Sequence, residues 1–178
     1  IYVMVYGVDP LRIYLYKEGI VRFATAVYSP PSRSNMNNLF MHLTNYAINK
    51  DSDDFIFNEE ESFDDVGHKR SLSAVLKQLE DEGQNSNKIM DRICDLIIKT
   101  IVMCQPSIAH AYRTLQPDDY ENSMIFEILG FDVLLDSKCK PWLLEVNSSP
   151  SFATDTPLDK KIKKNLITDT FKLLNLNS

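Results

Sequence analysis

Residues 126–152 constrain the fold of this chain most, because they place acidic and amide side chains inside two otherwise apolar runs. Residues 128–135 and 141–146 each predict a buried strand, and the polar residues 136–140 between them predict the turn of a hairpin. An ionised carboxylate inside an apolar strand is costly unless something pairs with it. Each acid in this hairpin therefore needs a partner.

Three oxygen-bearing side chains stand in these runs. Asp132 lies in the first run, and Glu145 and Asn147 lie two apart in the second. Residues two apart share one face of a strand, so Glu145 and Asn147 should point the same way. Two carboxylates and an amide form the hard-oxygen set that Mg²⁺ prefers. A lone acid would more simply cap a strand end or hold a loop, but the convergence of three favours a metal site.

Composition excludes some classes of protein. The chain has 178 residues, of which 44% are hydrophobic and 25% charged, as in an ordinary globular domain. The net charge of −6 argues against a generally basic nucleic-acid-binding protein. Three scattered cysteines without metal-ligand spacing predict reduced thiols. We recognise no signal peptide and no apolar run long enough to span a bilayer, and the strand-like start predicts a piece of a longer protein.

Periodicity predicts strands first, then helices, then the hairpin and a last helix. The predicted strands of an antiparallel meander are residues 2–6, 11–16 and 20–27. The predicted helices are residues 71–82, 85–104, 108–115 and 157–176. Residues 51–65 predict an acidic surface loop, and Trp142 a core position. This order predicts an α+β fold, with a mostly antiparallel sheet and helices packed on it.

Four motifs carry a resemblance to a known family. They are Y-L-Y-K-E-G-I-V-R-F-A-T (14–25), H-L-T-N-Y-A-I-N-K (42–50), G-H-K-R-S-L-S (67–73) and G-F-D-V-L-L-D with P-W-L-L-E-V-N-S-S-P-S-F (130–152). In this order they resemble the tubulin tyrosine ligase-like proteins, and the glutamylase branch fits best. The resemblance implies that residues 1–156 are the C-terminal lobe of an ATP-grasp fold, closed by a basic amphipathic helix over residues 157–178.

The resemblance also implies a reaction. ATP would phosphorylate a γ-carboxylate in a tubulin tail, and the amine of free L-glutamate would then attack the acyl phosphate. The implied cofactors are ATP and Mg²⁺, and the implied partners are tubulin tails and free glutamate, without nucleic acid or membrane. We expect a monomer in the cytoplasm on the cytoskeleton, with the cilium or basal body as a possible place.

Residue roles follow from the matched motif positions. The implied metal ligands are Asp132, Glu145 and Asn147. The implied nucleotide contacts are Thr44 and Asn45. The implied contacts to the incoming amino acid are Arg22, Tyr46, Lys69 and Ser148, and Arg22 and Glu145 are the implied catalytic residues. Without the resemblance, Arg22 would be interpreted as a member of an exposed structural ion pair. Lys69 would be interpreted as a residue that only caps the segment before a helix.

Two departures from the family's pattern bear on the product. Ser148 stands where elongating glutamylases typically have His, and Ala47 stands where Ser often follows the tyrosine. Both positions are near the implied amino-acid pocket, so initiation and elongation of side chains both stay open. A glycylase and an inactive microtubule-binding protein are the alternatives. Lys69 favours glutamate over glycine, because only glutamate has a second carboxylate, and the intact metal set favours an enzyme.

Four lysines follow within the last predicted helix. Lys160, Lys161, Lys163 and Lys164 are predicted on its polar face. Such a run is usually a solvated face. In this family a basic element follows the P-S-F segment and meets the microtubule, and a cationic face would help to recruit acidic tails.

Overall fold

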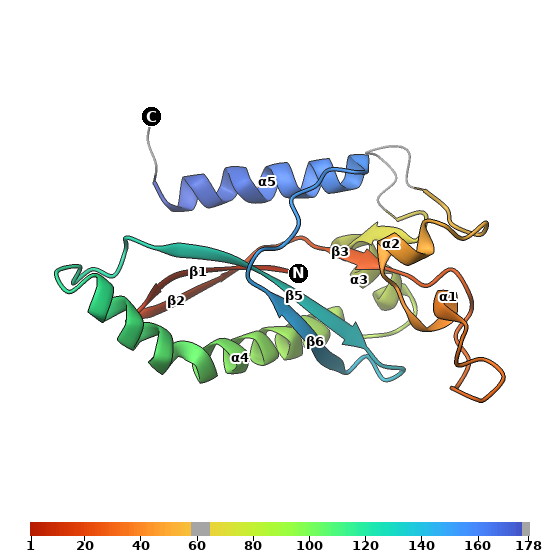
Figure 1. Cartoon of the computed structure of the whole chain (residues 1–178). Helices are drawn as coiled ribbons and strands as arrows, with labels where there is room; N and C mark the ends of the chain where they lie inside the picture. Colours follow the sequence, from red (N-terminus) through yellow and green to blue (C-terminus); the bar gives the residue numbers. More distant parts are fainter. Residues whose placement is uncertain (58–64, 176–178) are drawn as a thin grey trace. The chain divides into compact units, whose positions relative to one another are not determined.

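The computed structural model describes residues 1–57 and 65–175, which form two compact units. Unit 1 comprises Ile1–Glu18 and Leu79–Phe152, and unit 2 comprises Gly19–Gln78 and Ala153–Ser178. Each unit therefore combines segments that lie far apart in the sequence (Figure 1). The division falls inside helix α3 (Leu72–Asp81).

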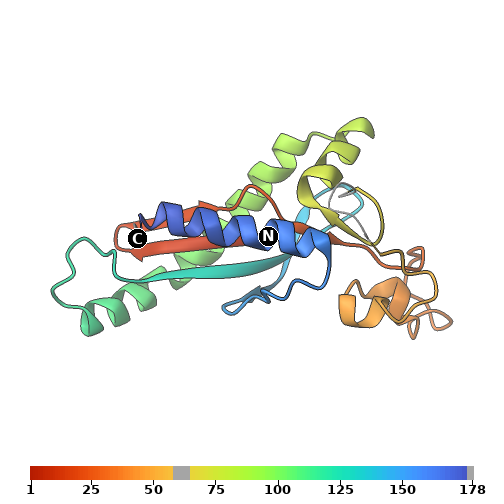
Figure 2. The ribbon, with the colours of Figure 1, turned by 90° about the horizontal axis from the view of Figure 1, so that it is seen from above.

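Unit 1 is built on one antiparallel sheet. Its strands are ordered β2-β1-β5-β6, with bounds β1 (Tyr2–Val8), β2 (Leu11–Leu15), β5 (Phe126–Leu135) and β6 (Pro141–Asn147). The long helix α4 (Ser86–Leu115) packs against β1, β2 and β6, and Figure 2 shows it crossing the strands obliquely. Tyr2, Val3 and Met4 are all buried, as expected of a central strand.

Helix α4 confirms the predicted isoleucine stripe and corrects two other expectations. Ile89, Ile93, Ile97 and Ile101 recur every four residues and are all buried. The predicted break before residue 108 is wrong, because α4 continues through Pro106. Its last turns are held by a small buried cluster of Ala109, Tyr112 and Val8. Within the described ranges, α4 alone is long and apolar enough to cross a membrane by length and composition, contrary to the prediction of no such run.

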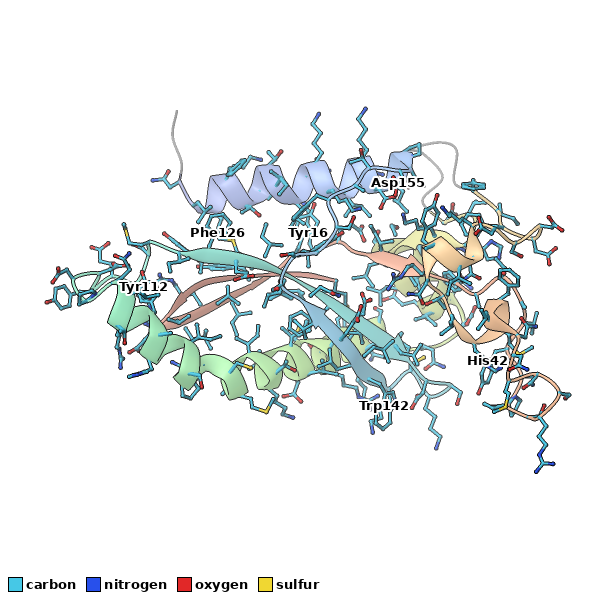
Figure 3. The ribbon with its side chains drawn as sticks, viewed as in Figure 1. Tyr16, His42, Tyr112, Phe126, Trp142 and Asp155 are labelled. Atoms are coloured by element: carbon cyan, nitrogen blue, oxygen red, sulfur yellow. The ribbon has the colours of Figure 1, made fainter. Side chains whose placement is uncertain are left out.

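Strand β6 confirms the hairpin but not its predicted burial. The turn over residues 136–140 is present, with the Asp136 carboxylate accepting the Lys138 and Lys140 amides. β6 lies at the edge of the sheet, and the residues from Trp142 to Val146 are exposed. Trp142 is 49% exposed rather than in the core, and its side chain projects from β6 (Figure 3). Its indole donates to Asp136 and lies under the Lys140 ammonium.

Unit 2 contains a smaller sheet and short helices. β3 (Ile20–Arg22) pairs antiparallel with β4 (Lys69–Ser71), so the third strand of the predicted meander does not join the first two. The helices α1 (Leu39–His42) and α2 (Tyr46–Asn49) lie between these strands in the sequence, and α5 (Pro157–Leu173) follows the hairpin of unit 1. The predicted acidic loop lies partly outside the described residues. The α+β class with antiparallel sheets is confirmed.

A buried asparagine fixes the segment that carries Thr44 and Asn45. Asn49 is 1% exposed, and its Oδ1 accepts hydrogen bonds from both the backbone N–H and the hydroxyl of Thr25, each at 3.0 Å. Its Nδ2 donates to the carbonyls of Leu43 (2.7 Å) and Asn45 (3.1 Å). One amide therefore ties the segment after β3 to the start of α2.

We expect Asn49→Ala to lower the free energy of unfolding by at least about 2 kcal/mol, because each buried group left unpaired costs about 1–3 kcal/mol. Urea unfolding of the full-length protein measures the loss, and hydrogen exchange at the Thr25 amide reports it locally.

Asn45→Ala is the matched control, since Asn45 is exposed and its side chain does not cap α2. The backbone carbonyl that accepts from Asn49 survives in this variant, so the change should stay within about 0.5 kcal/mol. Equal losses in the two variants would contradict the anchoring role of Asn49.

Candidate functional site

The residues singled out from the sequence fall into two groups, one in each unit. Unit 1 carries Asp132, Glu145, Asn147 and Ser148. Unit 2 carries Arg22, Thr44, Asn45, Tyr46 and Lys69. Each group is described within its own unit.

The two carboxylates of unit 1 face each other across the hairpin. Asp132 of β5 is the direct cross-strand partner of Glu145 of β6. Asn147, the partner of Gly130, donates from Nδ2 to Oε1 of Glu145 at 3.1 Å. The structure thus brings the three predicted metal ligands together on one face of the sheet, as the spacing required. Glu145 is exposed, and Asp132 and Asn147 are half-buried.

Two irregularities of the backbone shape this face. The register shifts between Asp132 and Val133, where Leu144 is the extra residue on β6. Such bulges bend a strand locally and re-aim its side chains. On the other side of the pair, a Cβ added to Gly130 would lie 3.0 Å from Cβ of Pro150 and 3.7 Å from that of Asn147. The missing side chain therefore lets the segment after Asn147, including the exposed Ser148, turn closely over the sheet.

The donor set fits a magnesium ion. Like charges directly opposite on neighbouring strands are destabilising. A divalent cation between Asp132 and Glu145 would reverse that cost, and the Asn147 carbonyl oxygen adds a neutral ligand. Two carboxylates and one amide leave coordination positions for water and phosphate oxygens, as magnesium sites in phosphoryl-transfer enzymes do. In the described ranges, no group of three or more His, Cys, Asp or Glu side chains is placed so that it could hold a metal ion.

The group of unit 2 is organised by the β3–β4 pair. Arg22 at the end of β3 is the direct cross-strand partner of Lys69 at the start of β4. Partners directly opposite each other project from the same face of a sheet, so two of the predicted amino-acid contacts share one face. The Lys69 ammonium also lies 4.7 Å from the centre of the Tyr46 ring, a cation–π contact. Three of the predicted contacts are thereby brought together.

Lys69 has a further partner that the sequence did not reveal. Its ammonium donates to Oδ2 of Asp159, in the first turn of α5, and both side chains are buried. Lys163, one turn later on α5, lies 3.2 Å from the other carboxylate oxygen and donates to the Ala153 carbonyl. The prediction of an exposed Lys163 is therefore wrong, because the buried carboxylate four residues earlier draws its ammonium inward.

The start of α5 holds this carboxylate in place. Thr156 is the N-cap, and its hydroxyl accepts the Asp159 backbone N–H at 3.2 Å and donates to Oδ2 at 2.8 Å. Burial by itself would raise the pKa of Asp159, but the hydrogen bonds from Lys69 and Thr156 and the charges of the two lysines lower it below its ordinary value. Asp159 is therefore ionised at neutral pH.

Burial and nearby negative charges act on Tyr46. Burial, followed by the negative charges of Asp155 and Asp159, raises the pKa of the Tyr46 hydroxyl. Asp155 stands just before α5, where Figure 3 labels it. The phenol stays protonated at neutral pH, so it can donate a hydrogen bond to a ligand.

Comparison with known proteins decides the family. The family model for the tubulin-tyrosine ligase family matches residues 1–177. The chain belongs to this family.

Several family members are similar over the whole chain. A protein of Tetrahymena thermophila described as "Probable beta-tubulin polyglutamylase" is 57% identical over 98% of the chain. The tubulin polyglutamylases TTLL6 of Homo sapiens and ttll6 of Danio rerio are 51% and 49% identical over all of it. The chain spans 15%, 19% and 22% of the Tetrahymena, human and zebrafish proteins.

Sequence reasoning found the family's motif residues but missed those that hold them. Thr156-Pro157-Leu158-Asp159 is a recognisable helix start, with a capping threonine, proline at the first helical position and an acid three residues after the cap. That pattern could have predicted the bond between Thr156 and Asp159. The burial of Asp159 beside Lys69 could not be predicted from it, because the two residues are 90 positions apart.

We expect the stability contributed by Asp159 to depend on pH. A carboxylate whose pKa is lowered on folding stabilises the protein above its unfolded pKa of about 3.9, and this is lost as pH falls through the folded pKa. Asp159→Asn should therefore cost about 3–5 kcal/mol at neutral pH, because it leaves two buried lysines uncompensated. The gap to wild type should shrink below about pH 4, as measured by urea unfolding across that range.

Asp169→Asn is the control on the same helix, since Asp169 forms an exposed pair with Lys172. Such pairs contribute only about 0–1 kcal/mol. A gap for Asp159→Asn that persists unchanged into acid would contradict the assigned ionisation.

Proposed function

We propose that this chain is part of an ATP-dependent tubulin polyglutamylase, which ligates free glutamate to γ-carboxylates in tubulin tails. The observation that carries the proposal is the cross-strand Asp132–Glu145 pair, with Glu145 hydrogen-bonded to the Asn147 amide, in a chain whose similar relatives bear polyglutamylase names. An inactive microtubule-binding protein would have no need for this costly juxtaposition.

Asp132, Glu145 and Asn147 would hold Mg²⁺, which would neutralise phosphate charge when bound. The Asn147 amide restrains the Glu145 carboxylate by its hydrogen bond, so this ligand is oriented in advance. Thr44 and Asn45 would contact the nucleotide from the segment that Asn49 anchors.

Arg22 would bind the carboxylate of the incoming amino acid, since a guanidinium offers two parallel donors. The Tyr46 hydroxyl, which is protonated at neutral pH, would donate a further hydrogen bond. Lys69 no longer argues for glutamate over glycine, because its charge is already offset by Asp159. The preference for glutamate rests on the names of the relatives.

The remaining parts of the proposal concern partners and place. A protein that modifies tubulin acts in the cytoplasm, on the cytoskeleton. It also acts in cilia where the microtubules of cilia are its substrate. Lys160, Lys161 and Lys164 of α5 are exposed and could meet an acidic tubulin surface, whereas Lys163 is buried.

We expect Glu145→Gln in the full-length protein to abolish incorporation of labelled glutamate into tubulin. The amide keeps the shape of the side chain but not the charge that a magnesium ion requires. Circular dichroism should show an unchanged fold, because Glu145 is exposed at a sheet edge.

The matched control is Glu127→Gln, which removes an exposed carboxylate from β5 at a position paired with Val5. It should retain activity. Near-normal incorporation by Glu145→Gln would contradict the metal assignment, and loss in both variants would point to a general charge effect.

Reversing the charge of Lys160 and Lys164 together should weaken binding to microtubules and leave ligation onto a short soluble tail peptide unchanged. The two residues are four apart, so one docking face can hold both. Binding should also fall with added salt, since exposed charges are screened over about 8 Å at physiological ionic strength. Co-sedimentation at two salt concentrations measures both effects.

Reversing Lys77 and Lys88, two exposed lysines on α3 and α4, changes the net charge equally and should leave co-sedimentation unaltered. Unchanged pelleting by the α5 variant would mean that its lysines are only a solvated face.

A further inference from the structure

Asp159 belongs to none of the groups that contact metal, nucleotide or amino acid in the proposed reaction, yet it is among the most deeply buried side chains described. We propose that Asp159 is a positioning residue of the amino-acid pocket, which holds the Lys69 ammonium over the Tyr46 ring. The inference rests on the proposed function, because the ligand of this pocket is the free glutamate of that reaction.

The β3–β4 pair creates the need for such a residue. Arg22 and Lys69 are cross-strand partners, and two cations directly opposite each other repel. Oδ2 of Asp159 accepts from the Lys69 ammonium and offsets its charge beside Arg22. The position of Lys69 in the pocket is thus determined by a carboxylate that comes from α5.

The effect extends from Lys69 to Tyr46. The ammonium lies over the ring of Tyr46, which also makes an edge-to-face contact with the ring of Phe55, with centroids 5.9 Å apart. These two contacts both restrain the ring. A shift of Lys69 would release one of them, and with it the direction of the Tyr46 hydroxyl that is available to a ligand.

The two lysines that pair with Asp159 allow the effect on the pocket to be separated from the effect on buried charge. Lys69 and Lys163 are both buried and both pair with this carboxylate. Lys69 contacts the Tyr46 ring, whereas Lys163 donates to the backbone carbonyl of Ala153. Loss of either lysine should disturb the buried charges, but only loss of the Lys69 arrangement should disturb the pocket.

The test measures initial rates of glutamate incorporation into tubulin by the full-length protein, with glutamate and ATP varied separately. Asp159→Asn should raise KM for glutamate at least about tenfold, because a hydrogen bond between charged groups that fixes Lys69 is lost. KM for ATP should change little. Lys163→Met should lower the melting temperature and leave KM for glutamate unchanged.

If Asp159→Asn does not accumulate as folded protein, Asp159→Glu takes its place. This variant keeps the charge but moves the carboxylate by one methylene, so KM for glutamate should again rise selectively. The proposal is overturned if the Asp159 variants lower the melting temperature without moving KM for glutamate, if KM for ATP rises equally, or if Lys163→Met has the same kinetic effect. A wild-type protein that incorporates no glutamate contradicts the proposed function instead.

Discussion

The buried carboxylate of Asp159 is the interaction on which the organisation of unit 2 depends. An isolated ionised carboxyl group at this depth would be strongly unfavourable. It is tolerated because Lys69 comes from β4, Lys163 comes from the next turn of α5, and the Thr156 hydroxyl closes the arrangement. Removing the Asp159 carboxylate would leave two buried ammonium groups uncompensated. The helix start and the short sheet are thereby joined by a contact that tolerates little variation in geometry.

The carboxylates of the hairpin in unit 1 are arranged differently from Asp159. Asp132 is the direct cross-strand partner of Glu145, so the hairpin places two acidic side chains opposite each other. Glu145 is exposed at the edge strand, where a hydrated cation and phosphate groups can reach it. The hydrogen bond from Asn147 orients this acid without adding positive charge. The two carboxylates thus differ in their surroundings: two ammonium groups lie beside the buried Asp159, whereas Asp132 has another acid as its cross-strand partner.

Local patterns predicted well what is held by local interactions. The isoleucine stripe of α4 and the shared face of Glu145 and Asn147 follow from periods of about four and two residues, and the turn over residues 136–140 follows from its polar composition. The pairing of β3 with β4 was missed, because 46 residues separate Arg22 from Lys69 and no period connects them. The continuation of α4 through Pro106 was missed for a related reason: its last turns are held by a packing cluster that includes Val8 of β1.

The lysines of α5 show how a single buried group changes the meaning of a charge run. By composition, Lys160, Lys161, Lys163 and Lys164 are equivalent, and the sequence predicts all four on the polar side of the helix. Asp159 removes this equivalence. A helix brings residues four apart onto one side, so Lys163 is the lysine placed over that carboxylate, and its ammonium turns inward. Lys160 and Lys164 lie one position further round the helix and stay exposed. One run of lysines thus contains both a buried partner of the acid and exposed positive charges, and the helical phase relative to Asp159 decides which lysine is buried.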